Sequence, residues 1–154
     1  MGTEIERTFL VHQEKLPPLK LGQAIHIEQG WLSEDPCVRI RLKTTREGLV
    51  AVTTVKGPGL IQRDEWEWEM PVDDAIEILE RGMWVSALVK KRHQLGRWEV
   101  DQFLGELEGL WLAEIELKSL DESFDRPEWL GREVTDDPAF TNMVLARDGL
   151  PPGV

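Results

Sequence analysis

The segment Val38-Arg-Ile-Arg-Leu-Lys43 alternates apolar and basic residues, and the segment Arg63-Asp-Glu-Trp-Glu-Trp-Glu69 alternates charged residues with others that include two tryptophans. Side chains at positions i and i+2 of a strand point to the same face. Each segment therefore predicts a strand with one ionic face and one apolar face. The ionic face is wholly basic in the first segment and mostly acidic in the second.

Six further segments repeat this period of two and are also expected to be strands. Turn-forming residues such as the Gly57-Pro-Gly59 triplet separate them. The expected strands are Glu4–Val11, Ala24–Trp31, Val38–Thr44, Val50–Lys56, Gln62–Met70, Leu88–His93, Arg97–Phe103 and Trp111–Ser119. Three short helices are expected at Pro71–Arg81, Asp121–Leu130 and Pro138–Arg147.

The ionic faces come in blocks of one predominant sign along the chain: acidic, basic, acidic, basic, acidic. One interpretation is an open antiparallel sheet whose charged face lies in water. The other is a closed barrel with a charged lumen, since about eight strands enclose room for one small ligand. Such a lumen would suit an elongated, highly charged ligand such as a polyphosphate with magnesium.

Composition limits the remaining possibilities. The 154 residues carry 29 acidic and 18 basic side chains, a formal net charge of −11, and the 41% of hydrophobic residues suits one domain over 1–154, with a core at about 3–146 and a tail at 148–154. The acidity disfavours nucleic-acid backbones. No apolar run could form a membrane span or a signal peptide, and one cysteine, Cys37, fits a reducing compartment. We therefore expect a cytoplasmic protein.

The opening segment, Glu4-Ile-Glu-Arg-Thr-Phe-Leu-Val11, resembles the Glu-x-Glu-x-Lys opening strand of the CYTH superfamily, also called triphosphate tunnel metalloenzymes. The resemblance covers about Thr3 to Ala146 in order. It continues through Gln29-Gly-Trp-Leu32, Val38-Arg-Ile-Arg-Leu-Lys43, Thr54-Val-Lys-Gly57, Arg63-Asp-Glu-Trp-Glu-Trp-Glu69, Lys90-Lys-Arg92, Trp98-Glu-Val-Asp101, Ala113-Glu-Ile-Glu-Leu117 and Trp129-Leu-Gly-Arg-Glu-Val-Thr135. It implies an α+β fold: an eight-stranded antiparallel closed β-barrel with a charged lumen and a few helices packed outside.

The resemblance also implies a site that binds triphosphate groups and, in many members, hydrolyses them with a divalent metal. Phosphoryl transfer needs positioning and charge neutralisation more than covalent help. The implied phosphate-binding residues are Arg39, Arg41, Lys56, Arg63, Lys90 and Arg92. The implied ligands of Mg²⁺ or Mn²⁺ are Glu4, Glu6, Glu114, Glu116 and Asp101. Lys56, Lys90 and Arg92 would stabilise the charge of the reaction, and Glu67 would orient the attacking water.

One position departs from the family pattern. The lysine of Glu-x-Glu-x-Lys is Thr8 here, on the same expected face as Glu4 and Glu6, so one phosphate-binding cation is missing. Arg7 should point to the opposite face and cannot replace it. Trp31 stands where relatives often carry tyrosine, and it could line the tunnel mouth or serve in packing.

The expected function is a metal-dependent hydrolysis of inorganic tripolyphosphate to pyrophosphate and phosphate. Within the family the alternatives are a class IV adenylate cyclase and a thiamine triphosphatase. The non-catalytic alternative is a module that binds polyphosphate or nucleotide without turnover. This alternative stays open because Thr8 replaces the family lysine. The expected partner is a triphosphate-containing small molecule, without nucleic acid or membrane, and the protein is expected to be a monomer or homodimer.

Overall fold

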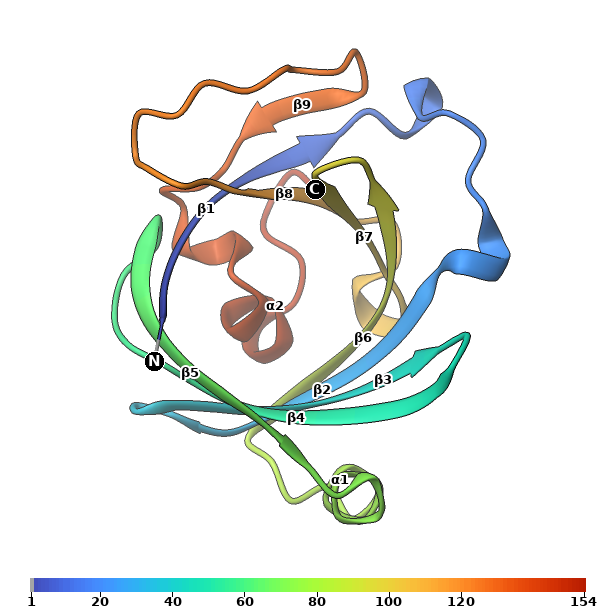
Figure 1. The fold of residues 1–154 in the computed structure, drawn as a ribbon, viewed down its shortest axis with the longest axis vertical. Coiled ribbons are helices and arrows are strands. Elements are labelled where there is room, and N and C mark those ends of the chain that lie inside the picture. The colour runs from blue at the N-terminus through green and yellow to red at the C-terminus, as the bar shows by residue number, and fades with distance from the viewer. Residues whose placement is uncertain (1) are drawn as a thin grey trace.

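Antiparallel strands close into a barrel in the computed structural model, which describes residues 2–154 (Figure 1). The strands follow the order β5-β4-β3-β2-β6-β7-β8-β1, and an additional pairing of β5 with β1 closes the ring. A ninth strand, β9, pairs with β1 outside the ring. The strands are β1 (Gly2–Val11), β2 (Ile25–Glu34), β3 (Cys37–Thr45), β4 (Gly48–Lys56), β5 (Gln62–Met70), β6 (Ser86–Leu95), β7 (Trp98–Phe103), β8 (Trp111–Glu116) and β9 (Leu130–Glu133).

Strand β1 closes the barrel because it pairs with β5 on one side and with β8 on the other. Its first residues pair with β5, with Glu4 opposite Arg63. Its later residues pair with β8, where Glu6 lies opposite Glu116 and Thr8 opposite Glu114. The eight-stranded antiparallel closed barrel expected from the sequence is confirmed, and each expected strand corresponds to one of these eight. The strands expected at 24–31 and 97–103 begin one residue too early, and the strand expected at 111–119 ends three residues too late.

The helices agree only in part with the sequence analysis. The helix expected at 71–81 is α1 (Val72–Glu80). The helix expected at 138–147 is divided into a short 3₁₀ turn, η4 (Pro138–Phe140), and α2 (Asn142–Asp148), because Thr141 has an extended backbone and caps α2. Three further 3₁₀ turns are η1 (Gln13–Lys15), η2 (Leu21–Gln23) and η3 (Gly105–Leu107).

The prediction of a helix at 121–130 was wrong. Turns and irregular chain occupy this segment, and β9 begins at its end. Pro127 lies in its middle and cannot donate a helical hydrogen bond. Phe124 and Trp129 instead pack edge-to-face on Trp98, with ring centroids 5.6 Å apart in both pairs. Tertiary packing on the outside of the barrel therefore determines the path of this segment.

Two apolar clusters stabilise the barrel from opposite sides. The outer cluster covers β1, β7 and β8 and is made of Phe9, Trp98, Val100, Ala113, Ile115, Leu117 and Trp129. The inner cluster lies at one end of the barrel, where Trp31, Leu88, Phe103 and Leu112 pack against Phe140 and Leu145. Trp31 is only 2% exposed and packs in the inner cluster, and it also lines the cavity inside the barrel, so it has both roles considered from the sequence.

The two helices therefore serve different purposes. Helix α1 packs outside the barrel on β2, β3 and β4, as expected. Helix α2 was also expected outside, but it contacts β6 and contributes Leu145 to the inner cluster, and it appears within the outline of the barrel in Figure 1. It thus lies across one end of the lumen. Among residues 2–154, no helix combines the length and the apolar character that crossing a membrane would require.

Candidate active site

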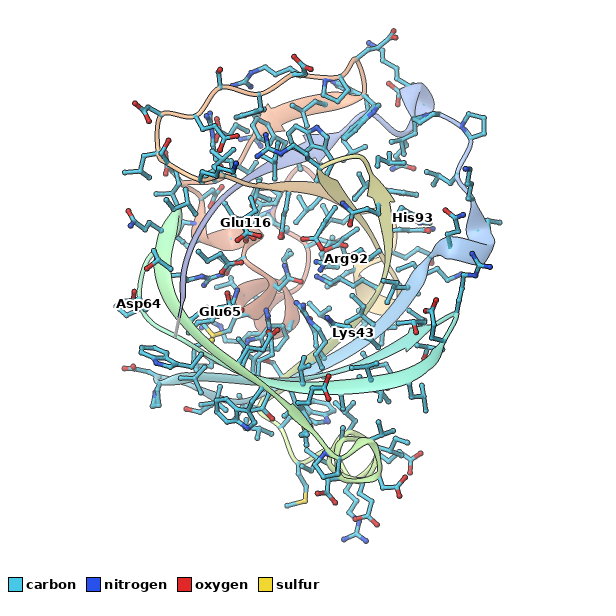
Figure 2. The ribbon with its side chains drawn as sticks, viewed as in Figure 1. Lys43, Asp64, Glu65, Arg92, His93 and Glu116 are labelled. Atoms are coloured by element: carbon cyan, nitrogen blue, oxygen red, sulfur yellow. The ribbon has the colours of Figure 1, made fainter. Side chains whose placement is uncertain are left out.

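The lumen holds a cavity of about 670 Å³ lined by charged side chains from most strands of the barrel. Figure 2 shows Arg92 and Glu116 pointing into it, whereas His93 and Asp64 point away. Of the residues implied by the family resemblance, Glu4, Glu6, Arg39, Arg41, Lys56, Arg63, Glu67, Lys90, Arg92, Glu114 and Glu116 line this cavity. The period of two therefore predicted the lumen residues correctly.

Asp101 stands apart from that set. It is 1% exposed and does not line the cavity. Its carboxylate contacts Lys90 Nζ at 2.8 Å and accepts two hydrogen bonds from Arg92, at 2.8 Å and 3.0 Å. Burial raises the pKa of Asp101, but Lys90 and Arg92 outweigh it and hold the pKa below its usual range. The sequence analysis counted Asp101 among metal ligands; here its oxygens are instead occupied by two cations.

Lys90, Arg92 and Asp101 form what we call the paired wall. Arg92 also donates to Glu99 at 2.9 Å, near the rim. Burial lowers the pKa of Lys90 to about 8 despite the neighbouring carboxylate. Two cations and one buried carboxylate leave this wall with a net positive charge, yet each cation has a partner within the chain.

Arg39 and Arg41 on β3 form the unpaired wall. They are 8% and 7% exposed, and among the described residues neither has a carboxylate within salt-bridge distance. Arg41 Nε donates to Gln29 Oε1 at 2.8 Å, and Arg39 Nε is buried without any partner. Burial lowers the pKa of both, and their mutual charge lowers that of Arg41 further. A buried cation without an anion is costly unless a ligand supplies the anion.

Lys56 lies between the unpaired wall and the acidic residues of β1. Its Nζ donates to Glu4 Oε2 at 3.0 Å, and Arg63 approaches the same oxygen at 3.8 Å. Burial raises the pKa of Glu4, but Lys56 and a hydrogen bond with Glu6 bring it down to about 2. Glu4 is therefore ionised and engaged by cations.

Glu6, Glu114 and Glu116 form the acidic wall, on the neighbouring strands β1 and β8. Burial, together with the charges of Glu114 and Glu4, raises the pKa of Glu6 well above its ordinary value. Hard cations such as Mg²⁺ prefer carboxylate oxygens as ligands, and a bound cation would relieve the repulsion between these carboxylates. The residues therefore fit such an ion. Within residues 2–154, no three His, Cys, Asp or Glu side chains form a ready-made metal cage. A bound ion would therefore need oxygens from water and substrate.

Glu67 lies on the side of the lumen formed by β4 and β5. Its Oε2 accepts a hydrogen bond from Thr54 at 2.7 Å. Burial raises the pKa of Glu67, but Thr54 and the cations Lys43, Arg39 and Arg41 lower it overall. The carboxylate is thus ionised near neutral pH and can accept a hydrogen bond from a water molecule.

Thr8 occupies the position expected from the face argument. Its side chain lines the cavity, and its backbone N–H donates to Thr135 Oγ1 at 3.0 Å. Arg7 points outward, where its Nε donates to Glu133 at 2.7 Å and its guanidinium stacks over Phe124. Arg7 therefore cannot supply the cation missing at position 8.

Gln29 and Asn142, which bond cations of the lumen, were not among the site residues expected from the sequence. Gln29 is completely buried and bonds both Arg41 and Asn142. Asn142 also accepts from Lys90 Nζ at 2.8 Å. Gln29 shares the inward face with Trp31, which was a usable signal. Asn142 begins a helix that was expected outside the barrel, so no local pattern pointed to it.

Comparison with known proteins agrees with this geometry. No family model matches the chain. The chain is 40% identical over 155 residues to an inorganic triphosphatase of Acetivibrio thermocellus, with 96% of each chain covered. It is 34% identical to an inorganic triphosphatase of Nitrosomonas europaea, covering 94% of this chain and 97% of the relative. A crystal structure of an inorganic triphosphatase superposes with a TM-score of 0.65 and 31% identity, covering 98% of this chain and 99% of the other.

Proposed function

Because the chain belongs to the CYTH superfamily of triphosphate tunnel metalloenzymes, we propose that it hydrolyses inorganic tripolyphosphate to pyrophosphate and phosphate. The observation that carries this proposal is the unpaired wall. Arg39 and Arg41 are buried cations without an anionic partner among the described residues, in a cavity that also contains a group of repelling carboxylates. A polyanion that brings its own divalent ion satisfies both requirements at once.

The cations would hold the substrate. The guanidinium groups of Arg39 and Arg41 offer bidentate hydrogen bonds to non-bridging oxygens, and Lys56 and Lys90 offer point charges. Arg63 and Arg92 line the same cavity and extend this cradle. As negative charge moves toward the leaving pyrophosphate, the same cations stabilise it.

The carboxylates would serve the metal and the water. Glu6, Glu114 and Glu116, with Glu4 beside them, would hold Mg²⁺ or Mn²⁺, which when bound neutralises phosphate oxygens. Glu67 would orient the attacking water. The oxygen of the water forms the new bond to the terminal phosphorus, and the bridging P–O bond breaks. The electron pair of the broken bond leaves with pyrophosphate, and the protons of the water pass to solvent and products. We place the reaction in the cytoplasm, which suits the single free cysteine, Cys37.

The direct test measures phosphate release from tripolyphosphate, ATP and thiamine triphosphate side by side, with Mg²⁺, with Mn²⁺ and with a chelator. We expect metal-dependent release that is fastest with tripolyphosphate. Lys90→Ala should abolish it, whereas Lys91→Ala, which removes an exposed lysine from the neighbouring position, should not. A ligand-induced rise in melting temperature without any release would instead identify a binding module.

A further inference from the structure

A chain of side-chain hydrogen bonds links β3, β2, α2 and β6 at the inner end of the cavity. Arg41 Nε donates to Gln29 Oε1 at 2.8 Å, Gln29 Nε2 donates to Asn142 Oδ1 at 2.9 Å, and Lys90 Nζ donates to the same oxygen at 2.8 Å. We call these four residues the amide relay. Its two ends are phosphate-binding cations of the proposed function, and its two middle members are neutral amides.

We propose that Gln29 and Asn142 are positioning residues that aim Arg41 and Lys90 at the substrate without neutralising them. This inference rests on the proposed triphosphatase function. An amide oxygen accepts a hydrogen bond as a carboxylate does, but it brings no negative charge. The relay therefore fixes the direction of each cation and adds no negative charge that would compete with the phosphates. Asp101 serves Lys90 in the opposite way, because it orients the ammonium and also compensates its charge.

The donors that remain free support this role. Arg41 uses only Nε in the relay, so both terminal nitrogens can form a fork to one phosphate. Lys90 has three N–H groups and contacts Asn142 and Asp101, which leaves one for substrate. Gln29 is completely buried, and both atoms of its amide are satisfied within the relay. Its conformation is thus fixed before any ligand binds.

Helix α2 enters the active site through this relay. Asn142 is its first residue, and the helix is seated by Leu145 in the inner cluster. At its other end Arg147, which does not line the cavity, donates to Glu34 on β2 at 3.0 Å in an exposed ion pair outside the amide relay. The position of α2 therefore determines the position of Asn142 Oδ1, and hence the direction in which Lys90 points.

The test uses variants that keep shape and change charge. Gln29→Glu and Asn142→Asp each place a carboxylate where the amide was. Without ligand, both variants should melt at the same temperature as the original protein or higher, because Arg41 has no anionic partner and the paired wall around Lys90 keeps a net positive charge. The dissociation constant of metal-free tripolyphosphate, measured by calorimetry, and the KM should each rise about ten-fold or more, since one charge-assisted contact is lost. Asn142→Ala should lower kcat/KM because Lys90 is no longer oriented, and it should not raise the melting temperature.

Arg147→Ala is the matched control, because it loosens α2 outside the relay. It should change KM and kcat by less than about two-fold, within the scatter expected for an exposed ion pair. Carboxylate variants that bind tripolyphosphate as the original protein does, or that fail to fold, would overturn the inference while the proposed function stands. An equal loss in Arg147→Ala would also overturn it, since seating of α2 alone would then explain the effect. An original protein that neither binds nor hydrolyses tripolyphosphate would overturn both.

Discussion

The paired wall (Lys90, Arg92, Asp101) and the unpaired wall (Arg39, Arg41) contain the same kinds of buried cation but solve the problem of burial differently. On the paired wall a carboxylate within the chain contacts both cations. On the unpaired wall the chain provides one amide oxygen and leaves Arg39 Nε without a partner. The first wall is complete without ligand. The second becomes complete only when an anion binds, which makes it the part of the lumen built for substrate.

The difference has opposite consequences for stability. Removing one member of a buried pair leaves an uncompensated charge and costs several kcal/mol. Removing a buried cation that has no partner relieves a desolvation penalty. Similar substitutions on the two walls should therefore change the free energy of unfolding in opposite directions.

The largest effect on stability is expected for Asp101→Asn. Lys90 and Arg92 would both lose their buried anion, and the free energy of unfolding should fall by about 3–5 kcal/mol. Urea denaturation without ligand measures this. Glu99→Gln is the control on the same wall, because Glu99 also pairs with Arg92 but has 38% of its side chain exposed. A loss in Asp101→Asn no larger than in Glu99→Gln would contradict the description of this wall as internally complete.

The largest effect on activity is expected on the acidic wall, which is the anionic counterpart of the unpaired wall. Glu6→Gln removes a carboxylate whose pKa is raised by burial and by Glu114 and Glu4. The ligand-free fold should lose no stability, yet metal-dependent turnover should fall about a hundred-fold or more. Glu116→Gln should act in the same direction. Initial rates over a magnesium titration measure this, with Glu47→Gln in an exposed turn as control. Two-fold losses in both variants would remove these residues from the metal site.

Arg39→Met and Arg41→Met are expected to separate binding from stability. Arg39→Met keeps apolar volume and removes a charge without an anionic partner, so the free energy of unfolding should stay the same or rise. Arg41→Met also leaves the buried Gln29 Oε1 without its donor, so its gain in stability should be smaller. Tripolyphosphate affinity should fall about ten- to a hundred-fold, which corresponds to roughly 1.5–3 kcal/mol for a charge-assisted contact. Calorimetry and ligand-induced melting shifts measure both quantities. Arg46→Met makes the same charge change at an exposed turn and should alter neither. Destabilisation of the ligand-free protein by Arg39→Met would mean that this arginine already has a partner within the chain.

The sequence was sufficient to predict which residues face the lumen, because side chains in a strand alternate regardless of context. Thr8 and Arg7 were assigned to opposite faces correctly on this basis alone. It could not predict which cations are paired. Arg41 and Arg92 have the same local pattern, and they differ because Arg92 lies opposite Asp101 in the β6–β7 register. Register across strands is a property of the closed barrel.

The misplaced elements have a similar explanation. A helix was expected over 121–130, but Phe124 and Trp129 of this segment pack on Trp98 of another strand. The helix near 142 was predicted as an element, yet its amphipathic pattern did not tell whether its apolar face packs outside the barrel or across its end. The role of Asn142 follows from that placement, so it was invisible at the level of sequence.

The smallest expected effect comes from completing the site with one more cation. Thr8 lines the cavity opposite Glu114 and beside Glu6, at the position where the family carries lysine. Thr8→Lys should raise kcat/KM on tripolyphosphate by up to one or two powers of ten, since one charge-assisted hydrogen bond contributes roughly 1.5–3 kcal/mol. The new ammonium would also have carboxylates of the acidic wall within reach. Pairing with them would reduce the gain and weaken the response to magnesium.

Thr3→Lys separates the effect of position from that of charge. Thr3 lies on the same strand but is exposed, where its hydroxyl donates to Asp64 at 3.5 Å. It should leave kcat/KM unchanged. If Thr8→Lys folds normally and is equal to the original protein or worse, the lumen is not a tripolyphosphate site that merely lacks one cation. Its acidic wall would then be matched to a ligand that carries more positive charge than tripolyphosphate, and the arginines of the unpaired wall would hold only that ligand's anionic end.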